Sequence, residues 1–281
     1  MTVELFRGDK KMQTAALALW QRVFGDPPEM ISAFFACAPF DHACFMAVSE
    51  DTLAGMLFSL PAVFRMGSSA YESRYIYAVA TDPAFRGQGV MTALEKYACK
   101  TAEKEKVQVL ALVPANRRLF SMYQKLGYET YFFHGTEQIP RRLNPKAELS
   151  SCEAEDFIDL REKYLSLHSA SFELCPALCR FRYEDFLRSG GEILLAHTAC
   201  GSGYLAFEQD GNTLYIRETS LFGDALSHAA GVLCEKTGAV RILTEGVYGK
   251  QRPYGMIKPI GIKERRKMPI KIDGYMNLML N

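Results

Sequence analysis

A glycine-containing loop at residues 86–89 is the segment of this chain best suited to bind a charged ligand. The loop, Arg86-Gly-Gln-Gly89, follows an apolar strand-like run that ends near Asp82, and it precedes a helical pattern. Glycines let the backbone approach a ligand closely, and the first N–H groups of a helix have no partner within that helix. The helix dipole adds about half a positive charge, and Arg86 adds a full one. These features predict a phosphate-binding loop.

Two other phosphate-binding motifs do not fit this loop. A P-loop requires GxxxxGK[ST], which the sequence lacks, and a dinucleotide fingerprint requires a third glycine where Thr92 stands. A tight turn between a strand and a helix remains the alternative for these four residues taken alone.

A second set of residues lies about thirty positions further along the chain. Asn116 and Tyr123 are seven residues apart on a predicted helix, Arg117–Leu126, which Gly127 ends. Seven residues are almost two helical turns, so both side chains face one direction and could meet one extended ligand. A tyrosine on an amphipathic helix is, taken alone, more often a core residue. Together with the loop, the pair indicates a specific site.

These motifs resemble the GNAT acyltransferases (GCN5-related N-acetyltransferases), whose pyrophosphate loop reads [Arg/Gln]-x-x-Gly-x-[Gly/Ala]. Arg86 and Gly89 match that loop, and Met91 departs from it at the usual small position. The segment Val79-Ala-Thr-Asp82-Pro83 matches the strand end that precedes the loop in the family. Asn116 and the ending Tyr123-Gln-Lys-Leu-Gly127-Tyr128 match its later segment.

The resemblance implies acetyl-CoA as co-substrate and a role for each matching residue. Backbone groups near Ala78 and Val79 would bond the pantetheine amides or the thioester carbonyl, and Asn116 would hold the pantetheine arm. Tyr123 would contact the cofactor and act as the general acid that protonates the leaving thiolate. The pyrophosphate would lie on the backbone of six residues: Arg86, Gly87, Gln88, Gly89, Val90 and Met91.

The acceptor amine must lose a proton before it attacks. A lysine-like amine has a pKa of about 10.4, so deprotonation at neutral pH costs roughly 4–5 kcal/mol. Glu72, His134 and the chain-end carboxylate of Asn281 are candidate bases, and none has a strong motif. Glu72 and His134 are as readily explained as ordinary strand residues. Some tandem-domain relatives place a terminal carboxylate in the cleft, and the apolar run Tyr275–Leu280 could be buried.

The acceptor pocket is expected near the loop Phe24–Pro28 and its neighbouring helices, a variable region of the family. Phe24 is a candidate substrate contact, and Asp26 could attract a cationic amine. Trp20, Phe34 and Phe35 could line an apolar pocket, although their helical spacing is equally typical of a core. The expected acceptor is a primary amine of a small molecule or peptide.

The order of elements predicts an α/β fold with mixed sheets and tandem GNAT-like domains. We expect a catalytic acetyl-CoA-binding domain over residues 1–140, a linker over 141–149 and a GNAT-like domain over 150–281. In each half, two helices, a strand meander, a helix and a strand follow one another. The resemblance extends to the bacterial tandem proteins related to enhanced-intracellular-survival acetyltransferases, which usually have a third domain. This chain is expected to lack that domain.

The second half lacks the phosphate-binding loop. The corresponding segment, Ser220-Leu-Phe-Gly223-Asp224, has no arginine, and Asp224 would repel pyrophosphate. The Asp224 carboxylate is better explained as a helix N-cap. We therefore expect a degenerate domain that binds no coenzyme A. The basic run Lys263-Glu-Arg-Arg-Lys267 is expected to form a solvated hairpin.

Composition excludes several classes of protein. A net charge of +1 does not favour nucleic acid or an anionic membrane surface, and no apolar run reaches the ~20 residues of a membrane span. The 8 cysteines are too sparse for a disulfide scaffold and form no metal motif. We expect a cytoplasmic bacterial N-acetyltransferase without a metal. A catalytically weak acetyl-CoA-binding regulator is the alternative, and oligomeric state is not predicted.

Overall fold

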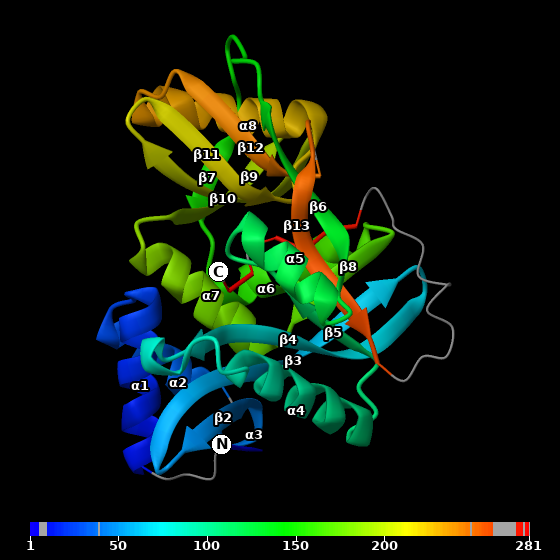
Figure 1. The fold of residues 1–281 in the computed structure, drawn as a ribbon. Coiled ribbons are helices and arrows are strands. Elements are labelled where there is room, and N and C mark those ends of the chain that lie inside the picture. The colour runs from blue at the N-terminus through cyan, green and yellow to red at the C-terminus, as the bar shows by residue number, and fades with distance from the viewer. Residues whose placement is uncertain (6–9, 39, 248, 261–273, 278, 281) are drawn as a thin grey trace. The chain divides into compact units, whose positions relative to one another are not determined.

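The computed structural model describes residues 1–5, 10–38, 40–247, 249–260, 274–277 and 279–280 (Figure 1). The chain divides into two compact units. The first unit contains Met1–Thr130 and Gly255–Pro269, and the second contains Tyr131–Tyr254 and Ile270–Asn281. Each unit has a mixed sheet, so the expected α/β fold is confirmed.

The sheet of the first unit has the strand order β1-β2-β3-β4-β5-β13. All neighbours are antiparallel except the parallel pair β4 and β5. Its strands and helices are β1 (Thr2–Leu5), α1 (Lys10–Phe24), α2 (Pro28–Cys37), α3 (Phe40–Ala43), β2 (Cys44–Ser49), β3 (Thr52–Met66), β4 (Ser69–Thr81), η1 (Pro83–Phe85), α4 (Val90–Lys104), β5 (Val109–Leu112), α5 (Arg117–Lys125) and β13 (Arg252–Pro259).

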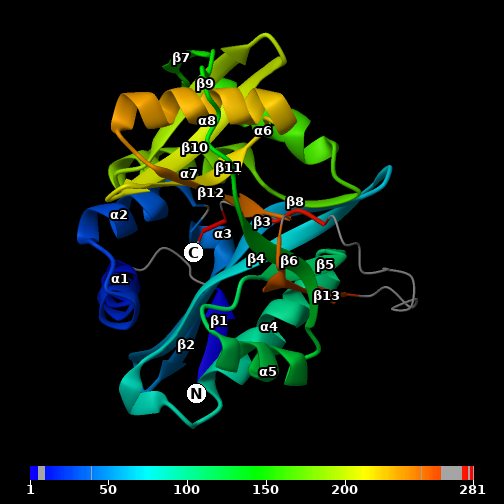
Figure 2. The same cartoon turned by 90° about the horizontal axis from the view of Figure 1, so that it is seen from above.

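The helices of the first unit cover both faces of its sheet (Figure 2). Neighbouring side chains on a strand point to opposite faces. Leu57 and Ile76 pack with α4 in the core, whereas the adjacent Phe58 and Tyr77 pack against Trp20 of α1. The predicted apolar pocket around Trp20 is therefore a filled aromatic core, because Trp20 is 1% exposed and contacts the rings of Phe34, Phe35, Phe58 and Tyr77.

The exchanged strand β13, orange in Figure 1, completes the sheet of the first unit beside β5. Met256–Pro259 pair with Val109–Leu112, although they lie more than a hundred residues later in the chain. The order of elements along the chain does not predict that a strand from the C-terminal half joins the sheet of the first unit. We expected the division at residues 141–149, and these residues lie in the second unit. β6 (Glu129–Gln138) lies within the expected first domain, but it pairs with β12 (Arg241–Gly246), and its residues from Tyr131 onward belong to the second unit.

The sheet of the second unit has the strand order β6-β12-β11-β10-β9-β7. Again the neighbours are antiparallel except for one parallel pair, β11 and β12. The remaining elements of this unit are β7 (Glu148–Ser151), α6 (Ala154–Ser166), β8 (Ala170–Leu174), α7 (Pro176–Arg188), β9 (Glu192–Thr198), β10 (Gly201–Asp210), β11 (Thr213–Thr219) and α8 (Gly223–Thr237).

The C-terminal segment is held by a buried polar network in the second unit. Arg161 donates to the Glu218 carboxylate at 2.8 Å and to the Asn277 backbone carbonyl at 2.8 Å. The Tyr275 hydroxyl donates to Glu218 at 3.1 Å. The expected strand Gly274–Leu280 is absent from the described residues, where Tyr275 forms a single bridge with Ser171. Two backbone hydrogen bonds of Tyr275, with Ala170 and Phe172, and the side-chain bonds above therefore hold this apolar segment together.

None of the helices within the described residues is long and apolar enough to cross a membrane.

Candidate functional site

The predicted phosphate-binding loop lies between β4 and α4, in the strand–loop–helix position expected from the sequence. Asp82 follows β4 as the N-cap of η1, and its carboxylate accepts a hydrogen bond from the Ala84 backbone N–H at 2.9 Å. The other Asp82 oxygen pairs with Arg22 of α1, a contact that sequence spacing gives no signal for. Gly87 and Gly89 both have φ of +78°, a conformation that residues with a Cβ rarely adopt. The two glycines are thus required by the path of the loop.

The N-terminus of α4 is open to a ligand. Gly89 is the N-cap residue and no side chain caps the helix, so its first N–H groups have no capping side-chain partner. Residues 86–89 are exposed, whereas Val90 is 2% exposed and packs in the core. Met91, the departure from the family pattern, is partly buried against the same core. A bulky residue is therefore accommodated without filling the loop.

The parallel strands β4 and β5 separate just before the loop. Their ladder joins Ser73–Tyr75 to Val109–Ala111 and stops there within the described residues. The register between β3 and β4 shifts at the same level, and Ala78 has φ of +47°. This bulge turns the backbone of Ala78 and Val79 out of the regular ladder. A contact between these backbone groups and the cofactor stays a prediction.

Asn116 is the N-cap of α5. Its side-chain oxygen accepts hydrogen bonds from the backbone N–H of Arg118 at 3.0 Å and of Leu119 at 3.3 Å. Capping occupies the amide oxygen, and a cofactor contact through the amide nitrogen stays a prediction.

Tyr123 faces the core of the first unit. It is 6% exposed, and its ring contacts that of Tyr128 edge to face at 5.6 Å. Burial and the nearby charge of Glu95 raise the pKa of Tyr123 far above its usual value of about 10. The phenol therefore keeps its proton at any physiological pH, which is the state a general acid requires.

A buried charged network lies beside Tyr123, and sequence reasoning missed it. Glu95 of α4 is 1% exposed and accepts from Lys258 of β13 at 2.9 Å, from Cys99 at 3.1 Å and from Tyr128 at 3.3 Å. Burial lowers the pKa of Lys258, but the negative charge of Glu95 and hydrogen bonds to Glu95 and Cys99 raise it by more. The pKa of Lys258 therefore lies above its usual value. The i,i+4 spacing of Glu95 and Cys99 is visible in the sequence, whereas Lys258 comes from the exchanged strand.

We predict strong coupling between Glu95 and Lys258. Lys258→Met leaves a buried carboxylate without its cation and should cost about 3–5 kcal/mol. The double variant Glu95→Gln/Lys258→Met should cost less than the two single changes together, with a coupling energy of about 1–3 kcal/mol. Urea unfolding of the four proteins measures this cycle. Additive costs would show that the pair does not join β13 to α4.

The candidate bases lie in different parts of the chain. Glu72 is exposed on β4, six residues before Ala78, and thus about 20 Å from the bulge along the strand. Asn281 lies outside the described residues, as does the basic run 263–267. Asp26 accepts from the indole N–H of Trp20 at 2.7 Å, and Phe24 is 43% exposed. The roles of these residues stay predictions.

His134 lies in the second unit and is 6% exposed. Burial, together with the charges of Arg252 and Arg217, lowers the pKa of His134 to about 4. Folded protein thus binds fewer protons than unfolded protein between pH 6.5 and 4, so His134 makes stability fall as the pH drops through this window.

We predict that the second unit loses about 3 kcal/mol of stability through His134 between pH 6.5 and 4. His134→Gln should flatten this part of the pH dependence. His197→Gln, which changes an exposed histidine of β9, should leave it unchanged. Urea midpoints measured at half-unit pH intervals provide the comparison. Equal slopes for wild-type protein and His134→Gln would refute the assignment.

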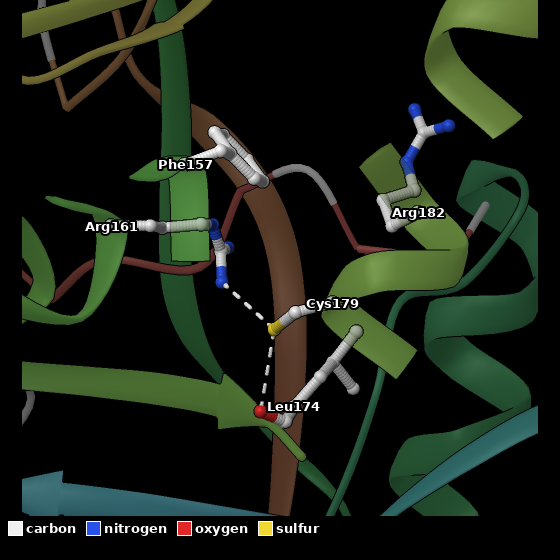
Figure 3. Close-up of a pocket in the computed structure, with 5 residues that line it drawn as sticks. All are labelled: Phe157, Arg161, Leu174, Cys179 and Arg182. Atoms are coloured by element: carbon white, nitrogen blue, oxygen red, sulfur yellow. Dashed lines mark hydrogen bonds between the residues drawn. The ribbon is translucent and has the colours of Figure 1, made fainter. Parts of the chain in front are cut away.

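A small cavity in the second unit adjoins the buried ion pair (Figure 3). Its volume is about 10 Å³, enough for a single water molecule. Figure 3 shows Arg161 and Cys179 turned toward each other, with a contact of 3.9 Å. Arg161 also pairs with Glu218, so this group holds the fold together. Among the described residues no group of His, Cys, Asp and Glu side chains could hold a metal ion.

Fold and site together define a class of protein. An N-terminal α/β unit has two parallel strands that separate beside an uncapped helix, with an arginine and two glycines in the loop between them. This is the strand–loop–helix arrangement that the sequence motifs predict for an acyltransferase domain.

Comparisons with known proteins name the family. Residues 8–131 match the acetyltransferase (GNAT) domain family. Residues 8–131 of the chain therefore form a GNAT acetyltransferase domain. No curated protein matches the chain in sequence.

Solved structures share the fold over nearly the whole chain. A probable N-acyltransferase from Enterococcus faecalis has a TM-score of 0.76 at 17% identity, covering 94% of this chain and 74% of its own. Eis1 from Mycobacterium abscessus has a TM-score of 0.73 at 12% identity, covering 94% and 75%. A GCN5-related N-acetyltransferase from Anabaena variabilis has a TM-score of 0.71 at 17% identity, covering 91% and 72%.

Proposed function

We propose that this protein transfers the acetyl group of acetyl-CoA to a primary amine of a small molecule or peptide. The observation that supports this most is the uncapped N-terminus of α4, reached through two left-handed glycines and an exposed Arg86. A Cβ added at Gly87 or Gly89 meets no neighbouring atom, so φ alone demands glycine there. An exposed loop of this shape fits a pyrophosphate.

Different residues of the first unit would bind the different parts of acetyl-CoA. Acetyl-CoA, when bound, supplies an acetyl thioester as the electrophile. The backbone N–H groups of residues 86–91 would bind the pyrophosphate, and Arg86 would pair with its charge. Backbone groups of Ala78 and Val79 would orient the pantetheine arm and polarise the carbonyl. Asn116 would contact the arm further along.

Tyr123 would provide the proton for the departing thiolate. Its phenol is neutral and buried beside Glu95, so the proton is on the side chain at neutral pH and can be donated as the carbon–sulfur bond breaks. The acceptor amine arrives charged and gives up its proton before attack. Glu72 and the Asn281 carboxylate remain the proposed bases, and Phe24 and Asp26 the proposed acceptor contacts. The proposed enzyme is cytoplasmic.

An amine library tests the proposal directly. Purified protein is incubated with acetyl-CoA and single amines, and release of free thiol is followed. We expect rates well above the amine-free rate for a chemically related group of amines. Saturable acetyl-CoA binding without thiol release for any amine would favour a regulatory protein instead.

A further inference from the structure

The second unit repeats the geometry that forms the phosphate-binding loop in the first. Strands β11 and β12 are parallel and α8 connects them, as α4 connects β4 and β5. The ladder between β11 and β12 joins Thr213–Ile216 to Arg241–Thr244 and stops there within the described residues. The adjacent β10 carries a register shift between Ala206 and Phe207, as β3 does near Met56. In such α/β units, ligands bind where the carboxyl ends of parallel strands face a helix N-terminus.

A cavity of about 190 Å³ lies at the N-terminus of α8, beside the end of β6 and Thr244 of β12. A cavity needs about 10–15 Å³ on this measure to hold one water molecule, so this one has room for a ligand the size of a small amino acid. Its apolar wall includes Ile139, Leu226 and Phe222, of which Phe222 is 49% exposed. The cavity is lined entirely by residues of the second unit.

Helix α8 presents uncapped N–H groups to this cavity. Its N-cap residue is Phe222, which has no side-chain hydrogen bond to offer. The first bond within the helix runs from Leu226 N–H to the Phe222 carbonyl at 3.4 Å. The expectation that Asp224 caps this helix is therefore wrong. Asp224 lies in the first turn and its carboxylate pairs with Arg142 at 2.7 Å.

A buried polar group in the cavity wall is a second, independent indication of a ligand site. Thr244 lines the cavity, is 2% exposed, and its hydroxyl has no hydrogen-bond partner among the described residues. A buried hydroxyl without a partner costs free energy, roughly 1–3 kcal/mol. Thr244 is the cross-strand partner of Glu137, so the two side chains share a face about 4.5–5.5 Å apart at Cβ. Glu137 is exposed and also lines the cavity.

The charges around the cavity select the ligand. Helix N–H groups and the Thr244 hydroxyl favour a carboxylate oxygen. Arg142 neutralises Asp224, whereas Glu137 has no ion pair with any residue that the structure describes. A plain anion such as pyrophosphate would meet the negative charge of Glu137. In a molecule that has an ammonium group beside its carboxylate, the carboxylate can bond the helix N–H groups and the ammonium can pair with Glu137.

We propose that the second unit binds a small zwitterionic α-amino acid with an aliphatic side chain. Its carboxylate lies at the N-terminus of α8 and bonds the Thr244 hydroxyl, its ammonium pairs with Glu137, and its side chain packs on Phe222 and Leu226. This site is independent of acetyl-CoA binding in the first unit.

Binding of leucine to the full chain tests this site. Titration calorimetry compares leucine with isovalerate, which lacks the ammonium, and isoamylamine, which lacks the carboxylate. We expect saturable binding of leucine and at least tenfold weaker binding of both analogues. Thr244→Val and Glu137→Gln should each weaken leucine binding at least tenfold. Glu148→Gln, at an exposed carboxylate of β7, should not.

Three outcomes would overturn the proposal. They are absence of leucine binding at millimolar concentration, equal binding of isovalerate and leucine, and unchanged leucine binding by Thr244→Val and Glu137→Gln. Melting temperatures of the variants establish that each is folded. The acetyl-CoA-induced shift in melting temperature, measured on the same samples, reports the first unit separately, so failure of one site leaves the other measurable.

Discussion

Arg86→Glu should abolish the stabilisation of the protein by acetyl-CoA. A ligand at 100 times its Kd stabilises the folded state by about 2.7 kcal/mol. For a unit of this size that corresponds to a rise in Tm of roughly 5–10 °C. The variant replaces an attractive charge with a repulsive one at the mouth of the pyrophosphate loop, so the rise should disappear while the Tm without ligand changes little, because Arg86 is exposed.

Lys104→Glu provides the matched control for this variant. Lys104 is an exposed residue at the last position of α4, about 20 Å from the loop along the helix, and the substitution makes the same change in net charge. It should keep the full acetyl-CoA shift. Thermal scans over a range of acetyl-CoA concentrations measure both variants. A normal shift in Arg86→Glu would show that the coenzyme binds elsewhere.

Tyr123→Phe should lower kcat by roughly 100-fold or more and leave the KM for acetyl-CoA nearly unchanged. A positioned general acid typically contributes 10²–10⁴-fold to rate. The substitution removes only the hydroxyl, so the buried ring still packs against Tyr128. Because the pKa of Tyr123 is far above its usual value, the wild-type enzyme should show no loss of activity from Tyr123 ionisation in the ordinary assay range.

Tyr97→Phe tests whether losing any tyrosine hydroxyl from the first unit has this effect. Tyr97 lies on α4, and its ring packs on Phe45 at 5.2 Å. Its kcat should stay close to that of wild type. Steady-state kinetics with an amine from the library screen separate the two variants. If Tyr123→Phe retained wild-type kcat, the general-acid role would have to be assigned to another group.

Local patterns explain why so much of the first unit could be predicted from sequence. The phosphate-binding loop depends on glycines at 87 and 89 and on a helix start at Val90, all of which are encoded within a few residues. The Asn116–Tyr123 spacing likewise lies within one helix. Such features can be predicted from the sequence because they depend on the backbone geometry of a few neighbouring residues.

Long-range partners could not be predicted in this way. Lys258 reaches Glu95 across 163 positions, and Arg161 reaches the Asn277 carbonyl across 116. Neither pair has a spacing rule, since only the tertiary fold brings the residues together. The predicted Asp224 cap is wrong for a related reason. The carboxylate had a partner, Arg142, 82 residues away, and the helix began at Gly223 without a side-chain cap.

The exchanged strand β13 has a consequence for how the protein is made. The acetyltransferase unit lacks one strand of its sheet until residues 256–259 have left the ribosome, because these residues pair with β5. Domains usually fold one after another during synthesis, N-terminal first. Here the N-terminal unit must wait for nearly the whole chain, with β5 as an unpaired edge in the meantime. Its folding is therefore completed only after the bulk of the second unit has been translated.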